Sequence, residues 1–253
     1  MDDWLLGRLS ESRTRWVEAM NNVSLREGVM ISHFEMLSDW QWYRRRGGSN
    51  KTTIQRYMSN WAEMLAPATP HLAEEFWDSL GRDGLLASNT LSDLSDLSSK
   101  DWSHTLAMEE YLRELIDSAR NIKILAQKHS EKPLTKMVIQ TSPLWKSELA
   151  SDAIEMSLSD FDFRAKGQDY LKNLPIFSNE SLRGEIFQTW ISITSGTKKK
   201  RGRINTWSYG QKTLLRNGFD ESSMINMNSS FIANSLGIEL SLIHISEPTR
   251  PAI

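Results

Sequence analysis

Three side chains near residue 70 have the types and spacing of a metal-binding cluster. His71, Glu74 and Glu75 lie three and four positions apart, so a helix would place them on one face. A zinc site needs further ligands, and the five histidines of the sequence are isolated from one another. Helix signals explain these residues without a metal, because Thr69 and Pro70 suit a helix start and carboxylates stabilise its N-terminal end. We therefore expect no metal ligands here.

No stretch of the sequence has the pattern of a catalytic nucleophile or of a nucleotide-binding loop. The Gly-x-Ser-x-Gly turn, the Gly-x-x-x-x-Gly-Lys-Ser/Thr loop and the Gly-x-Gly-x-x-Gly turn are all missing. Cysteine is also missing, which excludes disulfides and thiolate metal ligands and fits a reducing compartment. We accordingly assign no catalytic residue and no cofactor-binding residue to these 253 residues.

Three consecutive arginines form a first candidate site for RNA phosphates. Arg44, Arg45 and Arg46 follow Trp42 and Tyr43 and precede a pair of glycines, as expected at the C-terminal end of a helix. Cations in a last turn also interact with the helix dipole, which stabilises an exposed helix end by roughly 0.3–1 kcal/mol. The pattern therefore fits either a solvated helix end or a phosphate contact.

A second cationic cluster lies in the interval 186–219, which contains no acidic residue. Clustered cations without competing carboxylates suit phosphates, and the aromatic rings between them offer stacking faces. A solvated loop explains the cluster equally well, because short basic runs are common. The candidate RNA-binding residues of both clusters are Arg44, Arg45, Arg46, Lys198, Lys199, Lys200, Arg201, Arg203 and Trp207.

The overall composition is that of a soluble globular protein. Hydrophobic residues make up 39 % and charged residues 25 %, and the net charge of −2 creates no global field that would attract nucleic acid. No apolar run approaches the ~18 residues of a membrane span, and the acidic N-terminus lacks a signal-length apolar run. We expect a cytoplasmic protein that binds neither a membrane nor DNA.

Four amphipathic helices are predicted within residues 1–87. The first begins at a capping aspartate, Asp2 or Asp3, and ends at Asn21. Ser24 and Glu27 form a capping-box pattern that opens the second helix, which ends at the three arginines. The apolar residues predicted to face inward on this second helix are Val29, Phe34, Leu37 and Trp40.

The third and fourth helices complete the predicted bundle. Ile54, Tyr57 and Leu65 mark the inner face of the third helix. The fourth helix runs from Pro70 to Gly81, and its predicted apolar face consists of Leu72, Phe76 and Leu80. Amphipathic helices with short connections pack as an antiparallel bundle.

The second half of the chain is predicted to be a small α+β domain. The triplet repeat of Leu, Ser and Asp within 88–103 lacks periodicity and is interpreted as a linker. A long helix ending near Lys128, a short strand at 137–139 and a helix from Ser142 or Pro143 follow, and further helices continue to 236. The fold class is therefore mainly α: an N-terminal helical bundle, then a truncated α+β domain over 104–239.

Several segments together resemble a known family. DDWLLGRL at 2–9, SLREGVMISHFEMLSDWQWYRRRGG at 24–48 and APATPHLAEEFWDSLG at 66–81 resemble the C-terminal part of archaeal-type leucyl-tRNA synthetase, a class I aminoacyl-tRNA synthetase. The first and third motifs also resemble the anticodon-binding bundles of the isoleucine and valine enzymes. EEYLRELIDSARNIK and KMVIQTSPLWK, within 109–146, are similar to the start of the leucine enzyme's C-terminal domain.

The resemblance implies a partner and a parent reaction. The parent enzyme would attach leucine to tRNA-Leu with ATP and Mg²⁺, in a catalytic domain whose motifs these residues lack. This chain would bind tRNA and the missing catalytic domain, and we expect it to be inactive alone. The same region of an isoleucyl- or valyl-tRNA synthetase, or a stand-alone helical RNA-binding or scaffold protein, is the alternative.

The last segment, 240–253, has an unusual composition. An apolar run changes abruptly into Glu-Pro-Thr-Arg-Pro, and proline cannot continue a strand interior. The run through Arg250 resembles one reading frame of a sequencing adapter. We therefore expect the natural sequence to end near Glu239, and removal of the tail to leave stability unchanged. Its apolar residues could still dock on an open edge, whereas 248–253 should be extended.

Overall fold

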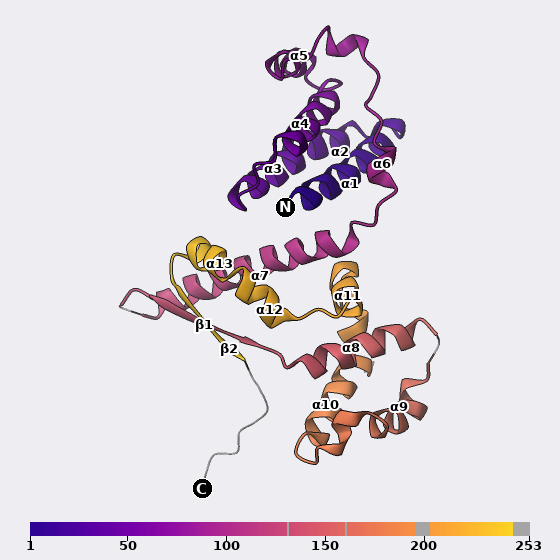
Figure 1. The fold of residues 1–253 in the computed structure, drawn as a ribbon, viewed down its shortest axis with the longest axis vertical. Helices are drawn as coiled ribbons and strands as arrows, with labels where there is room; N and C mark the ends of the chain where they lie inside the picture. Colours follow the sequence, from indigo (N-terminus) through magenta and orange to yellow (C-terminus); the bar gives the residue numbers. More distant parts are fainter. Residues whose placement is uncertain (131, 160, 196–202, 245–253) are drawn as a thin grey trace. The chain divides into compact units, whose positions relative to one another are not determined.

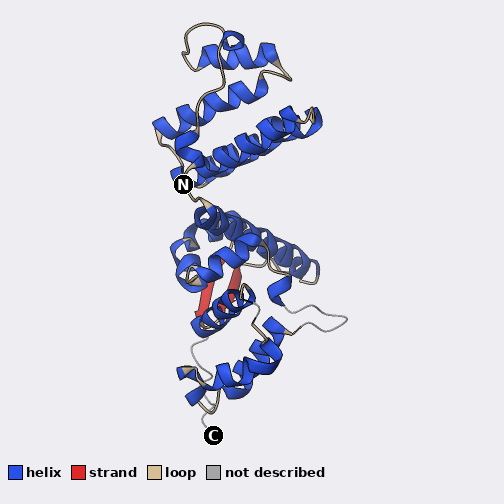
Figure 2. Ribbon diagram, turned by 90° about the vertical axis from the view of Figure 1, so that its right-hand side faces the viewer, coloured by secondary structure: helices blue, strands red, loops and turns tan. Residues whose placement is uncertain are grey.

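The computed structural model describes residues 1–130, 132–159, 161–195 and 203–244 (Figures 1 and 2). The chain divides into two compact units, an N-terminal unit of residues Met1–Leu106 and a C-terminal unit of residues Ala107–Ile253. Both units are mainly helical, and the strands of the described residues form one small sheet (Figure 2). The predicted fold class, mainly α with a small α+β portion, is thus confirmed.

The N-terminal unit is a helical bundle. Its elements are α1 (Asp2–Asn21), α2 (Leu25–Val29), the π-helix η1 (Met30–Glu35), α3 (Met36–Arg45), α4 (Lys51–Leu65), α5 (Pro70–Ser79), the 3₁₀-helix η2 (Leu86–Ser88) and α6 (Ser95–Ser98). The four predicted helices correspond to α1, the continuous run α2–η1–α3, α4 and α5. Trp4, Leu5, Leu9 and Trp16 of α1 are buried.

Of the two helix caps predicted at the start of the chain, the aspartate cap is wrong, and Ser24 has the predicted N-cap position without the predicted capping box. Met1 occupies the N-cap position of α1, and the carboxylate of Asp2 instead accepts a hydrogen bond from the hydroxyl of Tyr43 at 2.6 Å. Ser24 is at the N-cap position of α2 but makes no side-chain cap. Its N–H donates to the carbonyl of Ala19 at 2.8 Å and closes α1, so it is not free for the carboxylate of Glu27.

The π-helix changes which residues of the second predicted helix face inward. Phe34 and Leu37 are exposed, whereas Ile31, Met36 and Tyr43 are fully buried. A π-helix takes more residues per turn than an α-helix, so it rotates the apolar face relative to a regular 3.6-residue pattern. The predicted inward positions at Phe34 and Leu37 are therefore wrong.

Helix α5 also turns a different face to the core than its leucine spacing predicts. Ala73 and Trp77 are buried and pack with Leu65 and Leu86, while Leu72 is half exposed. Phe76 is partly buried and contacts the ring of Trp61 edge-on, with centroids 5.9 Å apart. Ala73 is small and so allows close helix packing. A pattern of apolar residues alone does not favour an alanine over a leucine at the buried position.

Residues 88–103, interpreted from the sequence as a linker, pack onto the bundle. Leu94 and Leu97 are buried, and α6 is held by an ion pair between Arg56 and Asp96 with a 2.8 Å contact. Glu63 accepts hydrogen bonds from both the N–H and the hydroxyl of Ser92. Tertiary contacts therefore hold the Leu-Ser-Asp repeat against the bundle, although its sequence has no helical or strand periodicity.

The C-terminal unit places a two-stranded sheet among helices. Its elements are α7 (Ser103–Lys128), β1 (Lys136–Thr141), α8 (Leu144–Ser157), α9 (Phe163–Lys172), η3 (Pro175–Ser178), α10 (Arg183–Thr194), η4 (Arg203–Asn205), α11 (Tyr209–Arg216), α12 (Glu221–Met227), α13 (Ser229–Leu236) and β2 (Glu239–His244). Its core is formed by buried residues of α8, α9, α10 and η4, among them Ile154, Leu171, Ile186 and Trp190.

The strand predicted at 137–139 is confirmed and extends over the whole of β1. It pairs in parallel with β2, with Lys136 opposite Glu239 and Thr141 opposite His244 (Figure 1). Residues 240–244, which the sequence suggests are adapter-derived, thus complete the only partner strand of β1 in the described part of the chain. Residues 245–253 lie outside the described residues.

Candidate nucleic-acid interface

The arginine cluster lies at the C-terminal end of α3, on a turn that two glycines shape. Gly47 has a left-handed backbone with φ of 82°, and the N–H of Gly48 donates to the carbonyl of Tyr43 at 2.9 Å. A Cβ at Gly48 would lie 2.3 Å from the ring of Tyr43, so only glycine fits there. The arginines therefore precede a turn whose geometry is fixed by packing.

Tyr43 anchors this end of the helix inside the bundle. Its buried hydroxyl donates to the carboxylate of Asp2 at 2.6 Å and accepts a hydrogen bond from the N–H of Asn50 at 3.1 Å. Burial of the phenol and the hydrogen bond to Asp2 raise the pKa of Tyr43. These contacts tie α3 to the start of α1 and the start of α4.

Two of the three arginines offer accessible charge. Arg44 and Arg45 are exposed, and neither forms an ion pair with a carboxylate of the described residues. The guanidinium of Arg44 lies 5.6 Å from the ring centroid of Trp40, and that of Arg45 lies 5.3 Å from that of Trp42. Nη1 of Arg44 also donates to the carbonyl of Gly48 at 3.4 Å. The rings hold both guanidinium groups in place, and the remaining N–H groups can reach a phosphate.

The second predicted cluster is described only at its edge. Lys198, Lys199, Lys200 and Arg201 lie outside the described residues, and Arg203 is the first residue of η4. Trp207 is partly buried and packs against the core of the C-terminal unit. The arginine cluster and Trp207 thus belong to different units of the chain.

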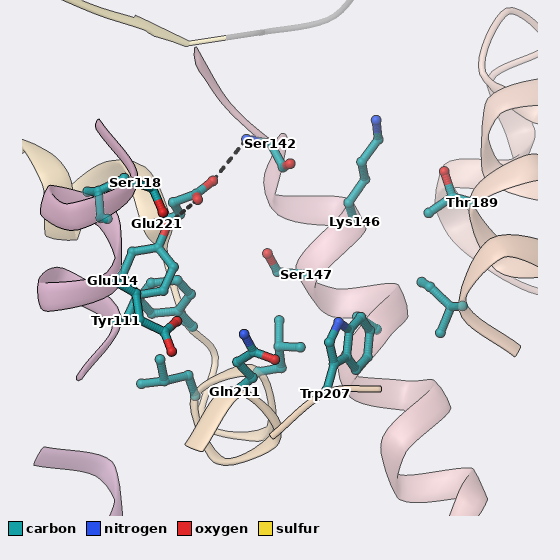
Figure 3. Close-up of a pocket in the computed structure, with 16 residues that line it drawn as sticks. Tyr111, Glu114, Ser118, Ser142, Lys146, Ser147, Thr189, Trp207, Gln211 and Glu221 are labelled. Carbon is teal, nitrogen blue, oxygen red and sulfur yellow. Dashed lines mark hydrogen bonds between the residues drawn. The ribbon is translucent and has the colours of Figure 1, made fainter. Parts of the chain in front are cut away.

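Trp207 lines a cavity of about 420 Å³ in the C-terminal unit (Figure 3). The cavity is bounded by α7, α8, α10 and α11, and the hydroxyl of Ser147 faces it from α8. On its α7 side the hydroxyl of Tyr111 donates to the carboxylate of Glu221, which also accepts from the N–H of Ser142 at 3.1 Å. Burial and this carboxylate raise the pKa of Tyr111.

The charges around this cavity are unsuited to a phosphate. Glu114 and Glu221 both line it, and Lys146 is drawn into an ion pair with Glu185 at 2.6 Å. Carboxylates repel an anion at short range. No histidine is among the described lining residues, so the serines here have no imidazole to act as a general base.

A second hollow lies between α9 and α10, which pack side by side in the C-terminal unit (Figure 1). We call it the α9–α10 hollow; its volume is about 540 Å³. It is lined by Phe163, Arg164, Gln168, Phe187, Trp190, Ile191, Thr194 and Ser195. The α10 residues of this lining belong to the acid-free interval 186–219, but the sequence does not predict their pairing with Phe163 and Arg164, because only the fold brings the two segments together.

Of the three residues near position 70 that have metal-binding spacing, Glu74 has a structural role. Glu74 accepts hydrogen bonds from the N–H groups of Leu86 and Ala87, both at 2.8 Å, and so caps η2. His71 and Glu75 are exposed. Within the described ranges, no group of three or more His, Asp or Glu side chains is arranged to hold a metal ion.

None of the helices in the described residues is both long enough and apolar enough to cross a membrane. Even α7, the longest helix, carries charged side chains throughout its length.

Comparison with known proteins identifies what the chain is similar to. A family model described as the anticodon-binding domain of tRNA ligase matches residues 2–138. A leucine–tRNA ligase of Methanothrix thermoacetophila is 32 % identical over 157 residues, which cover 62 % of this chain and 16 % of that protein. A leucine–tRNA ligase of Methanococcus maripaludis strain C7 is 31 % identical over 238 residues, which cover 89 % of this chain and 22 % of that protein.

The match to a third relative extends over the whole chain. The leucine–tRNA ligase of Methanococcoides burtonii is 28 % identical, and the match covers 100 % of this chain and 26 % of that protein. The chain therefore spans about a quarter or less of the length of these curated relatives.

Proposed function

This chain belongs to the family of anticodon-binding domains of tRNA ligases, and from that membership we propose that it is the tRNA-binding portion of a leucine–tRNA ligase. The family match over residues 2–138 carries the proposal, because it takes in the whole N-terminal unit and α7. The three relatives described above are leucine–tRNA ligases, which favours leucine over the isoleucine and valine alternatives. A stand-alone scaffold protein is likewise not favoured.

The arginine cluster is the part of the N-terminal unit best suited to touch the tRNA backbone. Arg44 and Arg45 are exposed, are free of carboxylate partners among the described residues, and lie beside aromatic rings. Each phosphate that they neutralise releases counterions, so binding should weaken as salt rises. We propose tRNA-Leu as the partner because the relatives are leucine enzymes.

The parent reaction is the ATP-dependent attachment of leucine to tRNA-Leu. We propose that ATP and Mg²⁺ bind to a catalytic domain outside these 253 residues, which would also be a partner of this chain, and that the reaction takes place in the cytoplasm. The sequence has none of the glycine-rich loops that commonly bind nucleotide phosphates. The chain alone should therefore show no leucine-dependent ATP–pyrophosphate exchange above a protein-free control.

A titration of fluorescent tRNA-Leu transcript against the full chain at several salt concentrations tests the proposal. Replacing Arg44 and Arg45 together by Ala should weaken binding and lower the slope of log affinity against log salt by about 1–2, because each neutralised phosphate contributes about 0.9 to that slope. Arg120→Ala with Lys172→Ala is the matched control, because both cations are exposed and pair with an aspartate three residues away. Failure of the unchanged chain to bind tRNA would refute the proposal.

A further inference from the structure

The α9–α10 hollow has an aromatic floor that the fold of the C-terminal unit holds rigidly. Trp190 is only 3 % exposed, and its ring lies 5.7 Å from that of Phe163 and 5.1 Å from that of Tyr170, measured between centroids. Gly167 lets the indole approach α9, because a Cβ there would lie 2.6 Å from its Nε1. The floor is thus fixed before any ligand arrives.

The walls of the hollow leave apolar surface open to solvent. Phe187 is only partly buried, and Ile191 is 40 % exposed one turn further along α10. A planar ring bound in the hollow would contact Phe187 of α10 and Phe163 of α9. Partly exposed aromatic rings of this kind are the usual platforms for nucleobases, because every base has a π-face.

The rim of the hollow carries the positive charge of Arg164, which lies among its described lining residues. Arg164 is exposed and forms no ion pair with any described residue. No aspartate or glutamate is among the described lining residues. The nearby Asp162 caps α9, because its carboxylate accepts the N–H groups of Arg164 and Ala165 at 3.0 Å. The carboxamide of Gln168 on the same rim can donate or accept hydrogen bonds.

We propose that the α9–α10 hollow binds one unpaired nucleotide of an RNA strand, with its base against Phe187 and Phe163 and its phosphate at Arg164. The choice of a nucleotide follows from the combination of two partly buried aromatic side chains with a guanidinium that has no ion pair among the described residues. The acid-free interval 186–219 includes the α10 residues that line the hollow, so the sequence after them contains no acidic residue before Asp220. The site lies beyond the part of the chain that the family model matches. Its RNA partner rests on the proposed function.

Two oligonucleotides of equal charge separate base stacking from phosphate binding. The full chain is titrated with a fluorescent twelve-residue oligouridylate and with the same oligomer carrying abasic riboses. We expect the uridylate to bind more tightly, and Phe187→Leu to remove about five-fold to about 150-fold of its affinity, because one stacked base contributes roughly that factor. Phe187→Leu keeps an apolar side chain, and Phe187→Trp should restore binding. Affinity for the abasic oligomer should stay unchanged in both variants.

Arg164→Ala tests the phosphate contact without touching the core. It should weaken binding of both oligomers and lower the salt slope by about 0.7, the value for one phosphate of a single strand. Lys172→Ala is the control, because it removes one exposed cation from the same helix but outside the hollow. Equal binding of the two oligomers to the unchanged chain, or an unaltered preference in Phe187→Leu, would overturn the proposal, as would binding that Arg164→Ala leaves intact. Persistent tRNA binding in those cases would preserve the proposed function.

Discussion

A buried ion pair connects α1 and α4 and provides a sharp test of the bundle's energetics. Nη2 of Arg13 lies 3.1 Å from Oε2 of Glu63, and the two residues are only 7 % and 4 % exposed. Glu63 also accepts both hydrogen-bond donors of Ser92, and so ties residues 88–103 to the bundle. Removing one charge would leave the other buried without its partner.

The size of the effect follows from that burial. Glu63→Gln keeps the shape of the side chain but removes its charge, and Arg13→Met removes the opposite charge. Each change alone should lower the free energy of unfolding of the N-terminal unit by about 3–5 kcal/mol, as when other buried pairs are broken. The double variant has no unpaired charge, and its cost should be only about 1–3 kcal/mol, the range for an imperfectly paired buried polar group.

Native-state hydrogen exchange of α4 amides under increasing urea measures this free energy in the N-terminal unit itself. The single variants should lose about two to four orders of magnitude in protection, since each 1.4 kcal/mol corresponds to a factor of ten. In Glu63→Gln the amides of α6 should also exchange faster, because Ser92 loses its charged acceptor. Additive losses in the double variant, or single losses below about 1 kcal/mol, would refute the idea that the pair is coupled and buried.

Three further predictions concern other parts of the fold. Gly48→Ala should lower the melting temperature, because the new Cβ would lie 2.3 Å from the ring of Tyr43. Gly184→Ala is the control in the same thermal scans, because a Cβ at that position has no neighbouring atom within 4 Å. Burial is the main cause that raises the pKa values of Tyr43, Tyr111 and Tyr170. The stability that these phenols contribute is therefore fully present below the ordinary tyrosine pKa of about 10, and it is lost as the pH rises above that value. Absorbance titration at alkaline pH should show late-ionising phenols that diminish in Tyr111→Phe, and a titration that this variant leaves unchanged would contradict the assignment. Deleting 240–253 should abolish the hydrogen-exchange protection of the β1 amides, because β2 is the hydrogen-bonding partner of β1. The sequence alone predicts instead that removal of this tail leaves stability unchanged. Protection of β1 that survives the deletion would contradict the role of β2.

Local chemistry fixed the helices of the N-terminal unit. Gly47 and Gly81 both have positive φ at the helix ends where the sequence places them, and Pro70 begins α5 as predicted. The motifs at 2–9, 24–48 and 66–81 were sufficient to indicate the family, because they combine turn glycines, apolar spacing and specific tryptophans in a fixed order. These features depend on neighbours within a few residues, so they can be predicted from the sequence.

The packed faces and the candidate sites were decided by tertiary structure. The π-helix exposes Phe34, and the close approach of α5 buries Ala73 in place of Leu72, although simple periodicity favours the opposite in both cases. The capping role of Glu74 depends on the chain returning at η2. The α9–α10 hollow joins Arg164 to Phe187 across 23 positions of sequence. Packing of this kind depends on which segments meet in space, and a one-dimensional pattern of apolar and charged residues does not contain that information.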